Sequence, residues 1–169
     1  MSSEVENPAR SSEPRIEVPS VGSVMHGPVV SVDAGDMLWD AMDLMLNRGL
    51  RHLVVVKADE VRGMLVDREL AAVWAMNPLG LKHTHVGDIL GPASRSVGPD
   101  VDVLTAANRM RAAGIDALVV VDSAKRPLGV VTDHDMLGIL AALLGGAGAG
   151  VTDAEPRYHG AGRPRLLPD

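Results

Sequence analysis

The chain has 169 residues, 46% of them hydrophobic, which is enough apolar material for one ordinary core and favours a single compact unit. Its net charge of −6, its lack of Phe and its content of only two Trp and one Tyr argue against DNA or RNA as a partner, because nucleic-acid binding needs basic patches or aromatic stacking platforms. The absence of Cys excludes a disulfide framework and a thiolate metal site.

Both ends of the chain have the composition of disordered tails. Residues 1–19 carry three prolines among Ser and Glu, and residues 145–169 carry Gly/Ala runs with three further prolines. The first 20 residues lack the apolar core of a signal peptide, and the longest uncharged run, 136–151, is shorter than the roughly 20 residues that span a bilayer. We therefore expect a cytoplasmic protein without a membrane partner.

The first half of the chain predicts a strand at 29–32 and then an amphipathic helix, whose apolar residues recur at i, i+3, i+4 and i+7: Leu38, Ala41, Met42 and Met45. Gly49 suits the left-handed conformation that closes a helix. A buried strand follows at 53–56, and a polar turn leads to a third strand at 63–66. A second helix is expected at 68–76, where Asn77-Pro78 ends it.

The same series of elements recurs about 65 residues later. The segment Val21-Gly22-Ser23-Val24-Met25 returns as Val86-Gly87-Asp88-Ile89-Leu90, and the buried strand returns at 118–121. A helix with the stripe Val103, Ala106, Ala107 and Met110, a closing Gly114, a third strand at 129–132 and a helix at 133–144 complete the second copy. The sequence thus predicts an α+β fold of two β-α-β-β-α repeats, at 20–78 and 86–144, joined by a link at 79–85 and packed about a pseudo-twofold axis.

The second copy contains Gly129-Val130-Val131-Thr132-Asp133-His134-Asp135 at the junction of its third strand and second helix, and Gly114-Ile115-Asp116-Ala117 before its buried strand. In these residues the chain resembles the CBS domain, named for cystathionine β-synthase, whose paired form is the Bateman module. The resemblance covers Val21 to about Leu144. It implies a regulatory module that binds an adenine nucleotide (AMP, ADP or ATP) or S-adenosylmethionine between its two repeats, without a catalytic cofactor.

The resemblance also implies roles for particular residues. Asp135 accepts hydrogen bonds from the two ribose hydroxyls. Thr132 places its hydroxyl toward the ribose or the phosphate, beside a helix N-terminus, where an anion is favoured. The remaining positions are the main chain at Arg95, Ser96, Ile115, Asp116 and Ala117 for adenine, Val130 as an apolar wall, and Arg68 and His134 for the phosphates.

Simpler interpretations exist for the same residues. Thr132 and Asp135 are also the pair expected to cap a helix, and the two roles can coexist. Arg68 and His134 are equally typical of a solvated surface. The first copy has Val66 in place of the hydroxyl residue and Glu69 in place of the Asp, so we expect its site to be empty, weak or altered in its choice of ligand.

No nucleophile elbow, phosphate-binding loop or zinc signature supports an enzyme, and the pair His83 and His85 is too weak a pattern to predict a metal site. We expect a non-enzymatic module, assembled as a homodimer of four repeats, that signals to a target protein. Trp39 and Trp74 have no counterpart in the second copy and favour an interface. The alternative is a ligand-free scaffold that serves dimerisation and protein contact.

Overall fold

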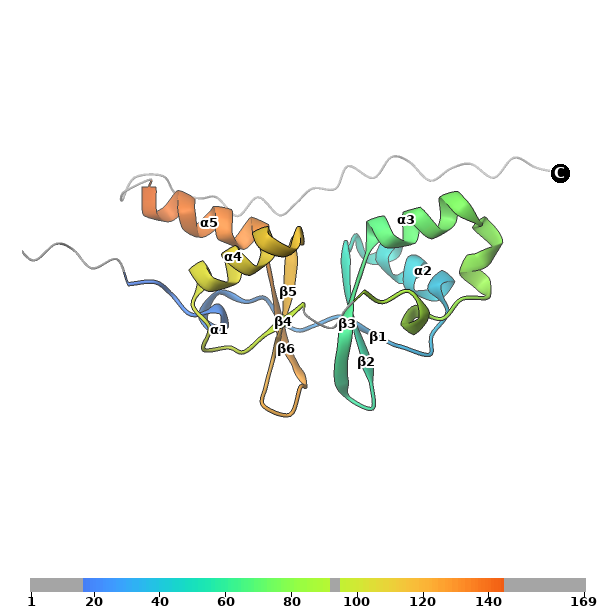
Figure 1. Ribbon diagram of the computed structural model, residues 1–169, viewed down its shortest axis with the longest axis horizontal. Coiled ribbons are helices and arrows are strands. Elements are labelled where there is room, and N and C mark those ends of the chain that lie inside the picture. Colours follow the sequence, from blue (N-terminus) through green and yellow to red (C-terminus); the bar gives the residue numbers. More distant parts are fainter. Residues whose placement is uncertain (1–16, 92–94, 145–169) are drawn as a thin grey trace, which may run out of the picture.

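The computed structural model describes residues 17–91 and 95–144. The expected C-terminal tail, and the expected N-terminal tail up to residue 16, lie outside the described residues. It confirms the α+β fold with its repeated series of elements (Figure 1). The first series is α1 (Val21–Val24), β1 (Ser31–Asp33), α2 (Leu38–Arg48), β2 (His52–Lys57), β3 (Glu60–Val66) and α3 (Asp67–Met76). The second is β4 (Ser96–Val97), α4 (Val103–Ala113), β5 (Ala117–Val121), β6 (Pro127–Thr132) and α5 (Asp133–Leu144), and the short helices η1 (Pro78–Lys82) and η2 (Val86–Asp88) lie between the two.

Each series forms its own three-stranded sheet, in the order β1-β2-β3 and β4-β5-β6. In both sheets the first pair of strands is parallel and the second pair is an antiparallel hairpin. Helices α2 and α3 cover the outer side of one sheet, and α4 and α5 that of the other (Figure 1). Because β3 and β6 end at the same edge of the molecule, α3 and α5 both begin at that edge (Figure 1).

The local signals in the sequence place most element ends correctly. Gly49 and Gly114 close α2 and α4 in the left-handed conformation, with φ of 63° and 62°. The first strand is the exception, since the expected run at 29–32 is assigned as a strand only from Ser31. Val30 nevertheless accepts a hydrogen bond from the N–H of Val54 (3.1 Å), so the extended run begins before the assigned strand.

The two hydrophobic cores exchange their N-terminal segments. Val21, at the start of the first repeat, is fully buried in the core of the second, and its N–H donates to Val101 O at 2.7 Å. Val86, at the start of the second repeat, is buried in the core of the first, and its N–H donates to Asp36 O at 2.8 Å. Leu81, in the stretch expected as a link, is 1% exposed and belongs to the first core. The repeats in the sequence therefore differ from the packing units in space.

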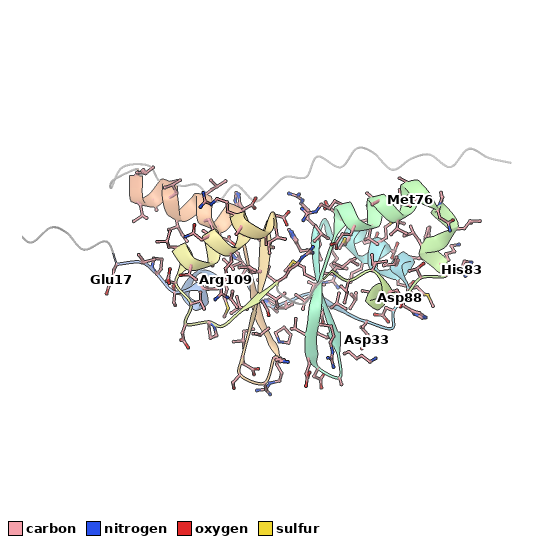
Figure 2. All side chains as sticks on the ribbon, in the orientation of Figure 1. Glu17, Asp33, Met76, His83, Asp88 and Arg109 are labelled. Carbon is pink, nitrogen blue, oxygen red and sulfur yellow. The ribbon has the colours of Figure 1, made fainter. Side chains whose placement is uncertain are left out.

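A third apolar cluster joins the two sheets. Val54, Met64 and Val66 of the first sheet pack against Ala117 and Val119 of the second, and all five are nearly inaccessible to solvent. Figure 2 shows side chains filling the space between the sheets. The sheet faces that the helices leave uncovered thus bury each other, as expected for a packed pair of repeats.

The burial of Leu81 predicts that η1 contributes to stability. Leu81→Ala removes a buried side chain from the first core, so we expect a loss of about 2 to 5 kcal/mol in the free energy of unfolding, measured by urea denaturation. Leu79→Ala is the matched control, because Leu79 lies in the same helix and is 73% exposed. It should cost less than about 0.5 kcal/mol. Equal effects of the two substitutions would contradict the assignment of this segment to the core.

Candidate functional site

The carboxylate of Asp135 lies at the start of α5, with only 8% of the side chain exposed. Its Oδ2 accepts hydrogen bonds from the backbone N–H of Thr132 (2.7 Å) and from the Thr132 hydroxyl (2.9 Å). The N–H of Asp135 lies 3.4 Å from that hydroxyl oxygen in return. The two side chains therefore form the reciprocal capping arrangement, which was the simpler interpretation of this pair.

The other oxygen of Asp135 faces a histidine of the first repeat. Nε2 of His26 lies 2.5 Å from Oδ1, and the His26 side chain is 74% exposed. The main chain of His26 is fixed by a pair of hydrogen bonds with Val130 of β6, at 2.9 Å and 3.0 Å. Sequence reasoning missed His26, because nothing in the local pattern links two residues that are 109 positions apart.

A cleft of about 370 Å³ opens between the two repeats beside this pair. Val130, Thr132 and His134 line one side, and segments of the first repeat form the other side, 26–30 before β1 and 49–54 at the start of β2. The volume falls in the range of small-molecule pockets. Of the residues that the resemblance implied, these three line the cleft and Asp135 lies at its edge, in contact with His26.

Six other implied residues, all in the described part of the chain, do not line this cleft: Arg68 of the first repeat, and Arg95, Ser96, Ile115, Asp116 and Ala117 of the second. The reason is the arrangement of the sheets. For the five second-repeat residues, β4 and β5 belong to the same sheet as β6, whereas the wall across the cleft from β6 belongs to the first repeat. The wall across the cleft is formed by the first-repeat counterparts of the implied residues: 26–30 corresponds to 91–95, and 49–54 corresponds to 114–119.

The first-repeat counterpart of the site is occupied by an ion pair. Oε2 of Glu69 accepts the N–H of Val66 at 3.0 Å, and its Oε1 accepts Nη2 of Arg95 at 2.9 Å. Nη1 of Arg95 donates to the carbonyl of Met64 at 3.2 Å. Arg95 therefore lies with the acidic residue of the first repeat and not with Asp135.

Between the two positions lies a cluster of charged side chains around Asp116. Its carboxylate lies 3.2 Å from Nε2 of His52, 3.5 Å from Arg68 and 3.8 Å from Arg51. The contact with His52 has the distance of an ion pair without the alignment of a hydrogen bond. Burial alone would raise the pKa of Asp116, but the imidazole of His52 and the charge of Arg68 outweigh it, so the pKa lies below its ordinary value. Arg68 is thus half-exposed and paired.

Comparisons with known proteins identify the family of the chain. The family model for the CBS domain matches residues 21–75 and 86–142. The chain belongs to the CBS domain family. A relative in Thermofilum pendens, an uncharacterized 33.4 kDa protein in a ribosomal RNA operon, is 33% identical over 135 residues, which cover 74% of this chain and 45% of that protein. The chain spans less than half the length of the curated relatives it matches.

Solved CBS structures share the fold. The CBS domain pair of protein MJ0100, in complex with 5′-methylthioadenosine and S-adenosyl-L-methionine, has a TM-score of 0.68 at 19% identity, over 75% of this chain and 99% of that one. CBSX2 in complex with AMP has a TM-score of 0.64 at 21% identity, over 74% of this chain and 98% of that one. Similarity at this level of identity establishes the paired architecture.

Within 17–91 and 95–144, no helix is both long and apolar enough to cross a bilayer. Across the same ranges, no three His, Asp or Glu side chains gather in an arrangement that could hold a metal ion.

The lowered pKa of Asp116 predicts a pH-dependent stability. A carboxyl group with a lower pKa in the folded state stabilises the protein above its unfolded pKa, about 3.9, and this contribution is lost as the pH falls through the folded pKa. The difference in free energy of unfolding between wild type and Asp116→Asn should therefore shrink as the pH falls from about 5 to below about 4. Urea denaturation at each pH measures it. Asp59→Asn, in the exposed turn between β2 and β3, is the control. A difference that stays unchanged at acidic pH would contradict the role of the Asp116 carboxylate.

Proposed function

We propose that this CBS pair is a non-enzymatic regulatory module that binds one adenosyl ligand, of the AMP, ADP or ATP type, in the cleft beside Thr132 and Asp135. The single observation that carries the proposal is the placement of this hydroxyl and carboxylate at the start of α5, on a cleft to which both repeats contribute. A carboxylate accepts hydrogen bonds from both hydroxyls of a ribose in a charge-assisted pair.

The lining of the cleft suits the two ends of a nucleotide. Val54 and Val130 offer apolar walls for a base, one from each repeat. Arg51 and His134 line the same cleft and can donate hydrogen bonds to a phosphate. The site thus offers a surface for the base, an acceptor for the sugar and donors for a phosphate.

Binding of the ribose would alter a contact between the repeats. Oδ1 of Asp135 already faces His26, so a ribose hydroxyl takes the place of the imidazole. His26 belongs to the segment of the first repeat that pairs with β6 of the second. The exchange of partners offers a route by which ligand shifts the angle between the repeats, and a target protein would read that shift.

The ligands of similar CBS structures support this class of ligand. The MJ0100 pair was solved with methylthioadenosine and S-adenosylmethionine, and CBSX2 with AMP. All three ligands contain adenosine, and the phosphate donors in this cleft favour the nucleotides. We propose that the protein senses such a nucleotide in the cytoplasm.

We also propose that the chain forms a homodimer through its helices. No residue of α5 is buried although the helix is mostly apolar, and it exposes a row of leucines: Leu137, Leu140, Leu143 and Leu144. Helices α2 and α3 likewise leave Leu46 and Trp74 exposed around an apolar groove of about 340 Å³, and Met76 lies at the outer end of α3 (Figure 2). Exposed apolar areas of this kind mark protein interfaces. Trp39 is less available for such an interface, because the ammonium of Lys82 lies 4.8 Å from the centre of its ring.

A ligand-free scaffold remains the second candidate, and one observation favours it. Both carboxylate oxygens of Asp135 already have partners within the chain, as a residue that only caps a helix would. The two candidates differ in whether an adenosyl compound stabilises the protein.

Thermal unfolding with AMP, ADP, ATP and S-adenosylmethionine tests the proposed function. At 100 times its dissociation constant, a ligand of the folded state stabilises it by about 2.7 kcal/mol, so a nucleotide should raise the unfolding temperature of the wild type. Asp135→Ala should abolish the response, because it removes the acceptor for the ribose. Glu69→Ala, the same truncation at the equivalent position of the first repeat, should retain it. No response of the wild type to any of the four compounds would favour the scaffold.

The exposed leucines of α5 predict a change of assembly. Leu140→Asp places a charge in the middle of the proposed interface, and we expect a shift from dimer to monomer in analytical ultracentrifugation. Leu128→Asp is the matched control, because Leu128 is also a partly exposed leucine but lies on β6, away from the helices. A wild-type monomer, or a variant that remains a dimer, would refute this interface.

A further inference from the structure

The two repeats place different side chains at equivalent backbone positions in front of their buried strands. The carbonyl of Val30 accepts the N–H of Val54, and the carbonyl of Arg95 accepts the N–H of Val119 at 2.7 Å. Both pairs are related by the same offset of 65 residues. Val30 and Arg95 therefore occupy equivalent positions. Val30 lies at the cleft beside Thr132, and Arg95 lies at the counterpart of that site beside Glu69.

Arg95 makes its side-chain contacts at the first-repeat counterpart of the nucleotide site. Its guanidinium donates to the carboxylate of Glu69 and to the carbonyl of Met64, at 2.9 Å and 3.2 Å. Glu69 stands at the position of Asp135, and Met64 at the position of Val130. The Arg95 side chain is 15% exposed and that of Glu69 is 22% exposed, so the pair lies largely inside the molecule.

The arrangement differs from the contact that His26 makes at the other site. His26 contacts Asp135 through one nitrogen and is 74% exposed, so its imidazole can turn into solvent. Arg95 donates to two partners, carries a permanent charge, and would leave the largely buried carboxylate of Glu69 uncompensated if it moved away. With its second oxygen on the N–H of Val66, Glu69 has both oxygens engaged.

We propose that Arg95 is an internal occupant of the first-repeat site and limits the chain to one bound nucleotide. The inference rests on the proposed function and deepens it, because it assigns the number of ligands to a single side chain. Arg95 takes the carboxylate that would otherwise bind a ribose, and it does so from the segment whose counterpart, 26–30, lines the cleft beside Thr132. Two nearly symmetric repeats thereby form a module with one site.

Titration calorimetry with AMP tests this assignment on the full chain. The wild type should bind one AMP per chain. The triple variant Val66→Thr, Glu69→Asp, Arg95→Val gives the first site the residues of the second, Thr132, Asp135 and Val30, and we expect it to bind two. The double variant Val66→Thr, Glu69→Asp retains Arg95 and should stay at one. Addition of Asp135→Ala to the triple variant should leave one site, the new one.

The outcomes separate this inference from the proposed function. A wild type that binds no AMP refutes the proposed function itself. A wild type that binds two refutes the role of Arg95 alone, as does a folded triple variant that binds one. Should Arg95→Val unfold the protein, Arg95→Met in the same background keeps the aliphatic stem and should also give two sites. His26→Ala, which removes the facing side chain at the other site, should alter the affinity for AMP while the stoichiometry stays at one.

Discussion

The packing of the two sheets against each other is the contact on which the rest of the structure depends. Val54, Met64 and Val66 meet Ala117 and Val119 in a layer without polar side chains, and each sheet would otherwise expose that apolar face to water. The same contact brings the ends of β3 and β6 to one edge, where α3 and α5 begin. A cleft with walls from both repeats follows from it, as does the meeting of Thr132 with residues that precede β1.

Paired charged side chains gather at the edge of the molecule where α3 and α5 begin. Each repeat has two acidic side chains in the first turn of its last helix. The second of each pair meets a nitrogen-bearing side chain from the segment that precedes a first strand: Glu69 with Arg95, and Asp135 with His26. Between them Asp116 lies among Arg51, His52 and Arg68. The acids are therefore satisfied within the chain, and any anionic ligand enters a region whose charges are already paired. The two sites differ chiefly in how firmly each acid is held.

The sequence was a good guide to whatever depends on local chemistry. Apolar periodicity predicted α2 and α4, the two glycines with positive φ predicted where they end, and the internal repeat predicted that the series would occur twice. Thr132 and Asp135 were found together because they are three residues apart. The partners across the cleft were not found, since periodicity carries no information on which sheet faces which. Arg95 was accordingly expected beside Asp135, and His26 was not expected at all. The contact of Arg95 with Glu69 and that of His26 with Asp135 both form only when the second repeat packs against the first.

The exchanged segments make the two repeats interdependent. Val21 completes the core of the second repeat and Val86 that of the first, so the chain crosses between the halves before either core is closed. Neither half retains its full interior when the other is removed, and opening the pair widely would expose both interiors to water. A signal carried by this architecture must therefore be a small rotation of interlocked halves, and the whole domain should melt as a single cooperative body.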